Sequence, residues 1–425
     1  MSSPLSGQFV IPTNREIGAS SHSEPDNACT YLCGNSLGPM SKRSKALVEE
    51  ELKVWATCAV TGHFTSHPHG RGWADFCDHI TPPLAELKEV ACMGTLTANL
   101  HLMMDSFYKP TPQRYKILCE AHAFPSDQAT LAHGFDPANA VLEMSPRSGE
   151  YTLREEDILT MIEREGSSIA LVIFAGVQYY TGQWFPMQSI TRAAQAQGCI
   201  CGWDLAHAVG NVPLSLHDWG IDFAVWCTYK YMNAGPGSIA GLFVHEKWKE
   251  TELPKFAGWW GHDPATRFAM PPKFSPIEGA QGFQQSNPGI LVAASLLGSL
   301  QVFKEVGMMQ PLRERSLQLT GALESLLKKS QYFVPVEEAS TRQSTKPAFT
   351  IITPDDPSGR GAQLSLLFLP SGVMNKVHDA LNKRGVIGDE RRPDVIRLAP
   401  APLFNTLKDC EQGAMILESV FDEFI

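Results

Sequence analysis

Two short apolar runs, each ending in ionisable residues, constrain the fold of this sequence more than any other feature. The run at residues 199–203 stops at Asp204, and the run at residues 222–227 is followed closely by Tyr229 and Lys230. In an open α/β sheet, neighbouring buried strands present the residues at their carboxyl ends to a ligand in the crevice outside the sheet. The two runs therefore predict two such strands, which deliver an aspartate, a tyrosine and a lysine to one site.

The groups expected at this site favour pyridoxal 5'-phosphate (PLP) as a cofactor. A lysine can hold the aldehyde of PLP as a Schiff base, and an aspartate that pairs with the pyridinium nitrogen lets the ring accept electrons. Lys230 precedes a glycine-rich run at residues 233–237, which permits close backbone approach to a ligand, and His207 follows Asp204 by three residues. A single lysine or aspartate at a strand end is more often a solvated charge, so the indication rests on their joint occurrence.

The rest of the chain alternates strands and helices, as α/β proteins with a mostly parallel sheet do. Apolar strands are predicted at residues 115–119, 141–144 and 169–174, and helices at residues 41–58, 98–108, 155–165, 191–197 and 289–305. Near-continuous apolar strands indicate a sheet that helices cover on both faces. We therefore expect an α/β fold with an N-terminal arm and helix at residues 1–60 and a large PLP-binding domain at residues 61–305.

Beyond residue 305 the composition turns more polar, and the pattern predicts a smaller α+β domain at residues 306–425. Strands are expected at residues 348–352, 364–369 and 395–399, and helices at residues 312–328, 373–384 and 407–424. Between the two domains' strands, the segments 258–262 and 284–289 lie in a long region with few periodic signals. Loops of that length in compact domains are usually functional or bound to a partner.

Composition argues against two classes of partner. The formal net charge of −10 offers no basic excess to neutralise phosphates, so no nucleic-acid partner is expected. The longest apolar run, at residues 169–177, is about half of what a membrane span requires, and residues 1–18 contain no apolar core of signal-peptide length. The ten cysteines include no C-x-x-C pair, which fits free thiols in a reducing compartment. These features predict a soluble cytoplasmic protein without a membrane partner.

The turn at residues 34–38 reads Gly-Asn-Ser-Leu-Gly and matches the G-x-S-x-G pattern of a nucleophile elbow. An elbow follows a buried strand inside the sheet, whereas only the N-terminal arm precedes Ser36. The residues before the turn are also too few to supply the strands that carry an oxyanion hole. We therefore favour an ordinary glycine turn ahead of the first helix.

The loop at residues 61–73 contains His63, His67 and His69, a grouping that could suggest zinc. No carboxylate, cysteine or fourth histidine follows at ligand spacing, so solvated loop histidines are favoured and no metal is expected. Further on, Leu96 and Thr97 precede the helix predicted at residues 98–108. Hydroxyls and free backbone N–H groups at a helix start suit a phosphate, but the same pattern fits an ordinary N-cap, and the sequence pattern leaves both readings open.

Several segments resemble the kynureninase family, whose members are PLP enzymes with the aspartate-aminotransferase fold. The matching segments are DLAHAVGNVPLSLHDWG, YKYMNAGPGSIAGLFVHEK, YLCGNSLGPM, FPSD, QYYTGQ and IRLAPAPLFN. They run from about residue 30 to the C-terminus and are specific to that family. The resemblance implies PLP attached to Lys230, with Asp204 on the pyridine nitrogen and Tyr229 beside the phosphate. Lys230, Tyr229 and Asp204 are the catalytic residues that it implies.

The resemblance also implies a set of further cofactor contacts. The ring of Phe124 is expected to stack on the pyridine, and His207 is expected to orient the cofactor. Family members often carry a hydroxyl where this chain has Ala175, so one hydrogen bond is expected to be missing. The remaining contacts implied around the phosphate and the ring are Leu96, Thr97, Pro125, Ser126 and Asp127.

For the substrate, the resemblance implies four contacts from separate parts of the chain. Ser36 is expected near the substrate, His63 is expected to face its aromatic ring, and Asn287 is expected in the same region. Trp259 and Asn287 are expected to reach the site at a subunit interface, which implies a homodimer. The fork of Arg397 matches a carboxylate bidentately, so we favour recognition of the substrate α-carboxylate over a structural ion pair.

The activity implied is the PLP-dependent hydrolysis of L-kynurenine and 3-hydroxy-L-kynurenine to anthranilate or 3-hydroxyanthranilate plus L-alanine. This step belongs to tryptophan catabolism and leads toward NAD. The alternatives are an aminotransferase or a desulfurase of the same fold, or a catalytically silent scaffold. A desulfurase needs a reactive cysteine on a flexible loop, which the sequence does not obviously offer. A scaffold is disfavoured because every expected site residue except the hydroxyl replaced by Ala175 is present.

Overall fold

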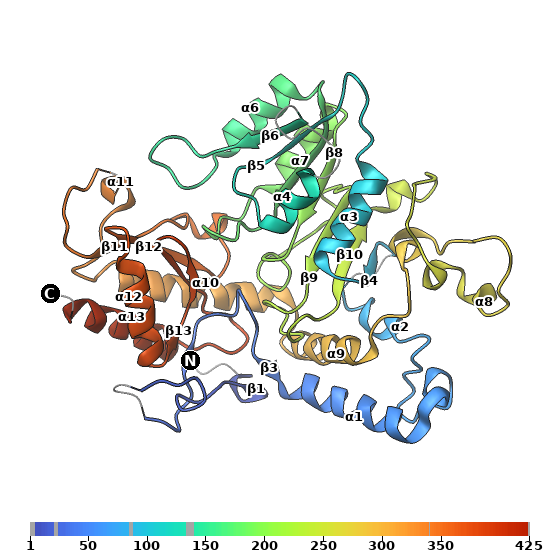
Figure 1. The fold of residues 1–425 in the computed structure, drawn as a ribbon, viewed down its shortest axis with the longest axis horizontal. Helices are drawn as coiled ribbons and strands as arrows, with labels where there is room; N and C mark the ends of the chain where they lie inside the picture. The colour runs from blue at the N-terminus through green and yellow to red at the C-terminus, as the bar shows by residue number, and fades with distance from the viewer. Residues whose placement is uncertain (1–4, 21–23, 85–87, 133–139, 340, 424–425) are drawn as a thin grey trace.

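A seven-stranded sheet forms the centre of the computed structural model, which describes residues 5–20, 24–84, 88–132, 140–339 and 341–423 (Figure 1). The strands lie in the order β4-β10-β9-β8-β7-β5-β6, and all are parallel except β10, which is antiparallel to both neighbours. Their bounds are Val90–Cys92 for β4, Lys116–Glu120 for β5, Val141–Met144 for β6, Ile169–Ala175 for β7, Ile200–Asp204 for β8, Phe223–Cys227 for β9 and Ala240–Val244 for β10. The predicted mostly parallel sheet is confirmed.

Helices cover both faces of this sheet, as the apolar strands predict. Side chains alternate between the two faces of a strand. Along β7, Leu171 and Ile173 belong to the core shared with α3, whereas Val172 and Phe174 belong to the core shared with α6, α7 and α9. These helices span Leu96–Phe107 for α3, Glu155–Glu165 for α6, Met187–Ala196 for α7 and Ile290–Glu305 for α9.

The N-terminal arm packs against the C-terminal part of the chain. Its strand β2 (Thr30–Tyr31) pairs in parallel with β13 (Val386–Ile387), and β1 (Phe9–Val10) pairs with β3 (Met40–Ser41). The long helix α1 (Lys42–Cys58) then lies on α9. A Cβ on Gly298 of α9 would lie 2.5 Å from the Cα of Ser44, so the two helices approach as closely as only glycine allows.

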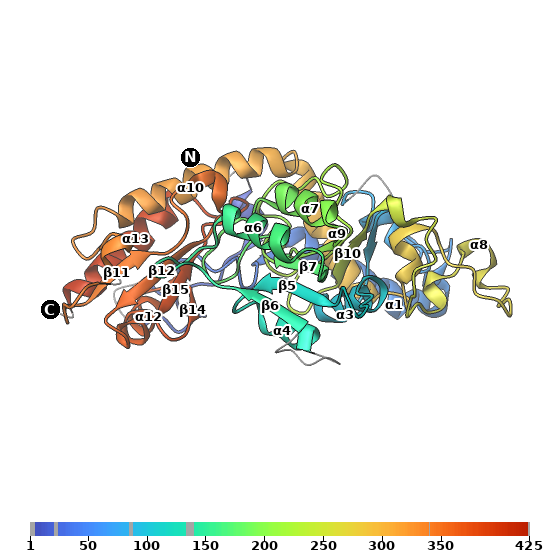
Figure 2. The same cartoon turned by 90° about the horizontal axis from the view of Figure 1, so that it is seen from above.

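The second sheet has four antiparallel strands in the order β11-β12-β15-β14. Its core contains Phe349, Phe368 and Phe421 and is closed by α10, α12 and α13. Figure 2 shows this α+β unit at one end of an elongated molecule, with α10 extending back toward the large sheet. The bounds are Ala348–Ile351, Leu364–Leu369, Asp389–Arg391 and Val395–Leu398 for β11, β12, β14 and β15, and Met309–Leu327, Val373–Lys383 and Leu407–Asp422 for α10, α12 and α13.

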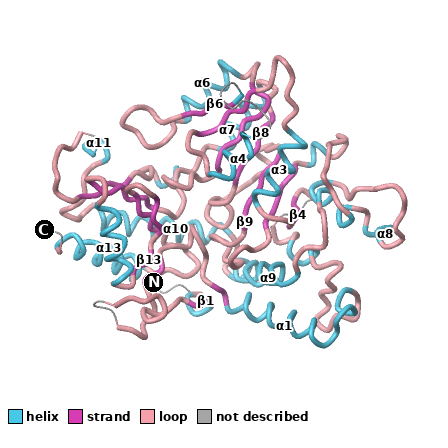
Figure 3. The backbone as a smooth tube through the Cα atoms, viewed as in Figure 1, coloured by secondary structure: helices cyan, strands magenta, loops and turns pink. Residues whose placement is uncertain are grey.

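The segment between β10 and α9 is mostly loop, as the weak periodicity predicts (Figure 3). It contains only short elements, of which α8 is the longest α-helical one. Short elements also occur elsewhere in the described chain. They are η1 (Ser6–Gln8), η2 (Ala59–His63), α2 (Cys77–Ile80), α4 (Pro125–Ala132), η3 (Glu246–Trp248), η4 (Trp259–Gly261), α8 (Pro264–Arg267), η5 (Gly279–Phe283), α11 (Val336–Ala339) and η6 (Pro357–Gly359).

Among the described residues, no single helix has both the length and the apolar composition needed to cross a membrane. Only the pair α9 and α10 meets those criteria when taken together, and the two helices are bent by 79° at their break.

Candidate active site

A cavity outside the carboxyl ends of β5, β7, β8 and β9 brings the predicted cofactor residues together. The strand ends place Asp204 and Lys230 there, as the two apolar runs predict. The lining includes every expected cofactor residue except Pro125, Trp259 and Asn287. It consists of Leu96, Thr97, Glu120, Phe124, Ser126, Asp127, Ala175, Val177, Tyr179, Asp204, Ala206, His207, Tyr229 and Lys230.

Lys230 is held in a tight loop after β9. The N–H of Asn233 donates to the Lys230 carbonyl at 3.0 Å, and the N–H of Gly38 donates to the Tyr229 carbonyl at 2.8 Å. The lysine Nζ lies 5.7 Å from the centre of the Phe124 ring. Burial lowers the pKa of Lys230, and the nearby Cys227 and Asp204 partly offset this effect. The lysine amine is therefore easier to deprotonate than an exposed one.

Asp204 and Asp127 form a buried carboxyl pair. Oδ1 of Asp204 accepts a hydrogen bond from the N–H of Ala206 at 2.7 Å, and the two carboxyl groups are hydrogen-bonded to each other. Burial and the charges of Asp204 and Glu120 raise the pKa of Asp127 well above its ordinary value. Burial also raises the pKa of Asp204, but the Ala206 N–H and Lys230 oppose that rise. Asp127 therefore holds the shared proton, and Asp204 carries the charge.

Glu120 is a site residue that the sequence analysis missed. It is the last residue of β5, is buried, and lines the cavity beside the two aspartates. Burial and the charge of Asp204 raise the pKa of Glu120 to about 8, although hydrogen bonds from the Ala175 backbone and the Gln178 side chain oppose the shift. A carboxyl at the end of a predicted apolar strand is the same signal that identified Asp204, so the signal was present.

Two helices begin at one side of the cavity. Thr95 is the N-cap of α3, since its side chain accepts from the N–H of Ala98, whereas Thr97 in the first turn faces the cavity. The Thr97 hydroxyl donates to Oγ of Ser126, which lies in the first turn of α4 behind Pro125, at 3.0 Å. Helix N-termini with hydroxyl groups bind anions. The two interpretations of the helix start thus apply to different threonines.

The residues of the cavity fit PLP. Oδ1 of Asp127 and Nδ1 of His207 are buried polar atoms without a hydrogen-bond partner among the described residues, and both side chains line the cavity. Such atoms are costly unless a ligand or water pairs with them. Burial and the positive charge of Lys230 lower the pKa of His207 well below its ordinary value, so its imidazole is neutral. Ala175 lines the same wall without a hydroxyl, as the sequence shows.

Arg397 lies behind the cavity wall rather than in its lining. Its side chain is fully buried on β15, forms an ion pair with Asp389, and donates from Nη1 to the carbonyl of Tyr179. Tyr179 itself lines the cavity. The ion pair is the arrangement that the sequence analysis disfavoured. Binding of a substrate carboxylate by Arg397 stays a prediction.

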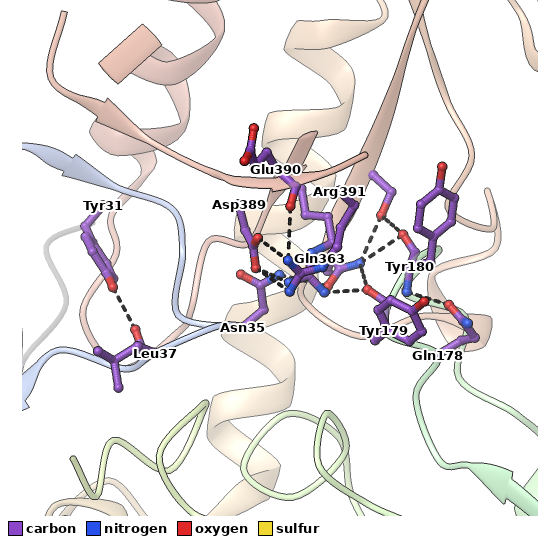
Figure 4. A network of polar contacts seen from close by, with 12 residues as sticks. Tyr31, Asn35, Leu37, Gln178, Tyr179, Tyr180, Gln363, Asp389, Glu390 and Arg391 are labelled. Carbon is purple, nitrogen blue, oxygen red and sulfur yellow. Dashed lines mark hydrogen bonds and ion pairs between the residues drawn. The ribbon is translucent and has the colours of Figure 1, made fainter. Parts of the chain in front are cut away.

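The loop that contains Tyr179 joins the cavity to the C-terminal sheet (Figure 4). Nε2 of Gln363 donates to the Tyr179 carbonyl at 3.0 Å, and Oε1 of Gln363 accepts from Asn35 at 3.0 Å. Ser365 donates to the Tyr180 carbonyl at 2.6 Å. These bonds connect the cavity wall, the turn at residues 34–38 and the C-terminal sheet. Ser36 lies half-buried in that turn, close to the backbone of Lys230.

The other predicted substrate residues lie apart from the Lys230 cavity within this chain. Trp259 and Asn287 line a separate surface hollow. Ring contacts connect His63 through Phe64 and Phe268 to Trp259, with centroid distances of 6.1, 5.8 and 5.4 Å. Oδ1 of Asn287 is buried and has no hydrogen-bond partner among the described residues. The expected site residues therefore fall into two groups on one chain.

Solved structures with the same fold define the class of protein. A cysteine desulfurase from Thermococcus onnurineus NA1 matches with a TM-score of 0.72 at 15% identity, covering 93% of this chain and 95% of that chain. The cystine C–S lyase C-DES, which carries a PLP cofactor, matches with a TM-score of 0.72 at 16% identity, covering 92% of this chain and 97% of that chain. The aminotransferase class-V family model matches residues 126–266. The fold and the site define a fold-type-I, PLP-dependent enzyme.

The family follows from closer relatives. A family model described as the kynureninase C-terminal domain matches residues 312–417. The kynureninase of Yarrowia lipolytica is 50% identical over 407 residues, covering 91% of this chain and 93% of that protein. The kynureninase of Nematostella vectensis is 49% identical over 407 residues, covering 93% of this chain and 86% of that protein. The chain belongs to the kynureninase family, and the resemblance seen in its motifs is confirmed.

Proposed function

We propose that the protein hydrolyses L-kynurenine and 3-hydroxy-L-kynurenine, giving anthranilate or 3-hydroxyanthranilate together with L-alanine. This activity makes it a hydrolase acting on a carbon–carbon bond in a ketone, in tryptophan catabolism and de novo NAD biosynthesis. The observation that carries the proposal is the cavity in which Lys230, Asp204 and Asp127 meet, in a chain 50% identical to a kynureninase.

The test is an assay of the purified protein with PLP and each substrate, in which the aryl acid and alanine are quantified separately. We expect equal amounts of the two products. Transfer of the amino group to a keto acid, without release of an aryl acid, would contradict the proposal in favour of an aminotransferase.

The chain's own residues have distinct roles toward the cofactor. Bound PLP supplies an electron sink for the carbanion that forms next to the substrate's amino group. Lys230 would hold it covalently, and Asp204, whose charge the protonated Asp127 supports, would pair with the pyridine nitrogen. Thr97 and Ser126 would bind its phosphate at the N-termini of α3 and α4.

Proton transfer and substrate binding fall to the same wall of the cavity. The buried Lys230 amine, whose pKa is lowered by burial, is suited to take the proton from the substrate's α-carbon. Tyr229 is placed to relay a proton beside the phosphate. The neutral His207 would orient the ring, and Arg397 would bind the α-carboxylate together with Ser36 near the substrate. Cleavage of the Cβ–Cγ bond then requires water to add to the ketone carbon.

A homodimer with shared sites accounts for the separation of the predicted residues. Trp259 and Asn287 do not line the Lys230 cavity of their own chain. Around them Phe64, Phe256 and Phe268 are each at least half exposed. Exposed aromatic side chains of this density mark an interaction surface. We propose that a second copy of the chain covers this surface and that Trp259 and Asn287 complete the partner's site.

The desulfurase alternative is not supported by the cysteines. All ten are free, nine are buried, and Cys58 is half-buried. Burial raises the pKa of the Cys227 thiol, the cysteine that precedes Lys230 most closely. Reactive thiols require the opposite shift and solvent access. The likeness to desulfurase structures, at 12–16% identity, therefore concerns the fold alone.

We further propose a cytoplasmic location and domain boundaries near residues 60 and 305. Free cysteines support the location, since reducing compartments keep thiols unpaired. The second boundary is supported by the break between α9 and α10. The pairing of β2 with β13 indicates that the arm packs with the C-terminal unit, although it precedes the large sheet in sequence.

A further inference from the structure

Glu89, His217 and His245 gather at the edge of the large sheet opposite to Lys230. Glu89 directly precedes β4, and His245 directly follows β10. Because β10 is antiparallel to β9, its end lies at the amino-terminal edge of β9, whereas Lys230 follows the carboxyl end of β9. His217 comes from the turn before β9. The cluster is therefore separate from the cofactor cavity.

The distances within this cluster match those between the ligands of a tetrahedral metal ion. Oε1 of Glu89 lies 3.0 Å from Nδ1 of His217 and 3.5 Å from Nδ1 of His245. All the candidate ligand atoms lie within 4.8 Å of one another. Zinc bonds to imidazole nitrogen and carboxylate oxygen are about 2.0–2.1 Å long, which separates two tetrahedral ligands by roughly 3.3 Å.

The hydrogen bonds of His245 leave two acceptors facing each other. Its Nε2 lies 3.1 Å from the His217 carbonyl and must donate to it, and its Nδ1 accepts from the N–H of Lys247 at 3.1 Å. Burial lowers the pKa of His245, which therefore carries no second proton. Its Nδ1 lone pair thus faces the Glu89 carboxylate at 3.5 Å. A cation between the two atoms turns this repulsive contact into an attractive one.

The surroundings of the cluster allow an ion to enter and be held. The side chain of Glu89 is 4% exposed, and the N–H of Glu246 donates to its Oε1 at 2.7 Å, which fixes the carboxylate. The side chain of His217 is 42% exposed and borders a surface hollow that Asp218 also lines, so solvent reaches the site. The charge of the nearby Lys247 is balanced by Asp222, with Nζ and Oδ1 2.7 Å apart.

We propose that Glu89, His217 and His245 bind a divalent transition-metal ion of the zinc class, with water as the fourth ligand. Two imidazoles and one carboxylate in a tetrahedral arrangement suit zinc better than magnesium or calcium, which prefer oxygen ligands. The ion connects β4, β10 and the turn before β9, so its role is structural. The proposal does not depend on the reaction at Lys230.

The test is metal binding by the PLP-loaded protein after dialysis against a chelator. Zinc titrated in a calorimeter should bind at one site per chain, and cobalt at the same site should give the visible absorption of a tetrahedral complex. Zinc should also raise the melting temperature. Loss of a residue that only supports a metal ligand lowers metal affinity roughly 10- to 100-fold, and loss of a ligand should cost more.

His217→Ala and His245→Ala should each abolish the stoichiometric site. His101→Ala, which removes an exposed histidine from α3, should retain it. Glu89→Gln keeps the shape of the side chain and tests the ligand where alanine variants fail to fold, as judged by their cofactor absorbance. Absence of a stoichiometric site in the wild-type protein would overturn the proposal. Undiminished affinity in folded His245→Ala and Glu89→Gln would overturn it equally.

Discussion

Asp389 and Arg397 face each other across the antiparallel strands β14 and β15 and form a buried ion pair. A second guanidinium shares the same carboxylate, because Nη1 of Arg391 lies 2.9 Å from Oδ1 of Asp389. Two positive charges thus meet one negative charge just behind Tyr179. The excess positive charge favours a further carboxylate, which supports the proposed role of Arg397 in substrate binding.

Arg397→Lys should therefore weaken substrate binding. Lysine keeps the charge but loses the planar fork that pairs with a carboxylate. We expect kcat/KM for kynurenine to fall by roughly 10- to 100-fold, as the loss of about 1.5–3 kcal/mol from charged hydrogen bonds implies. The fall should appear chiefly in KM. Arg391→Lys serves as the matched control and should change KM much less. A lower melting temperature with unchanged KM would mean that Arg397 is structural only.

Lys230→Ala should abolish the covalent attachment of PLP. The side chain is buried in the cavity, where Asp204 and Phe124 adjoin it. Reduction with borohydride followed by mass spectrometry of the peptides should find the cofactor on Lys230 in the wild type and on no lysine in the variant. PLP attached to a different lysine in Lys230→Ala would show that the assignment is wrong.

Glu120→Gln tests the buried acid at the end of β5. The pKa of Glu120 is raised from 4.5 to about 8, so the folded state binds a proton that the unfolded state releases between those values. This contribution to stability is complete below pH 4.5 and is lost as pH rises through 8. The wild-type protein should thus lose stability relative to Glu120→Gln as pH rises through this window.

The measurement for Glu120 is urea unfolding of both proteins at several pH values and one PLP concentration. Glutamine imitates the protonated acid, so the two proteins should be similar in stability at low pH and differ by a few kcal/mol at most at high pH. Glu143→Gln, an exposed carboxylate on the neighbouring strand β6, is the control and should show no such trend. Parallel curves for wild type and Glu120→Gln would refute the buried acid.

The centre of the site was predictable because the strands that build it are strongly apolar. The runs at residues 199–203 and 222–227 correspond to β8 and β9 within one residue at each end. Their carboxyl ends fix Asp204 and Lys230 with no need for long-range information. The helix predicted at residues 191–197 begins earlier, at Met187, because the first turn after Pro186 carries few periodic signals.

Other features depend on contacts between distant segments and left no local signal. The strand β10 follows a glycine-rich run and is antiparallel in a sheet that otherwise reads as parallel. The strand β14 reads Asp-Glu-Arg without apolar alternation, so neither its existence nor its register opposite Arg397 was predictable. The contacts of Glu89 with His217 and His245 join residues more than 100 positions apart.

A mixed dimer tests whether the sites are shared between two copies of the chain. Lys230→Ala removes the cofactor lysine, and Asn287→Ala removes a side chain that lines a different hollow of the same chain. Each variant alone should be inactive or nearly so. After exchange of chains, one site of the mixed dimer combines an intact Lys230 with an intact Asn287 and should regain activity. No gain in activity, with exchange proven by mass spectrometry, would argue against shared sites.

The last prediction concerns the choice between the two substrates. Nδ1 of His63 lies 3.1 Å from the Val60 carbonyl and must donate to it, which leaves Nε2 as an acceptor. The imidazole packs edge-on against Trp73 at 5.0 Å and is half-buried. If His63 faces the aromatic ring, Nε2 can accept a hydrogen bond from a 3-hydroxyl group. We therefore expect 3-hydroxykynurenine to be preferred over kynurenine.

His63→Phe should lower kcat/KM for 3-hydroxykynurenine more than for kynurenine, because only the hydroxylated substrate loses a partner. An unmatched buried polar group costs about 1–3 kcal/mol, so the preference should shrink by roughly 10-fold. His69→Phe replaces an exposed histidine of the same loop and should leave the preference unchanged. Equal losses for both substrates would mean that His63 only shapes the loop. No change with either substrate would mean that His63 is a solvated histidine without contact to the ring.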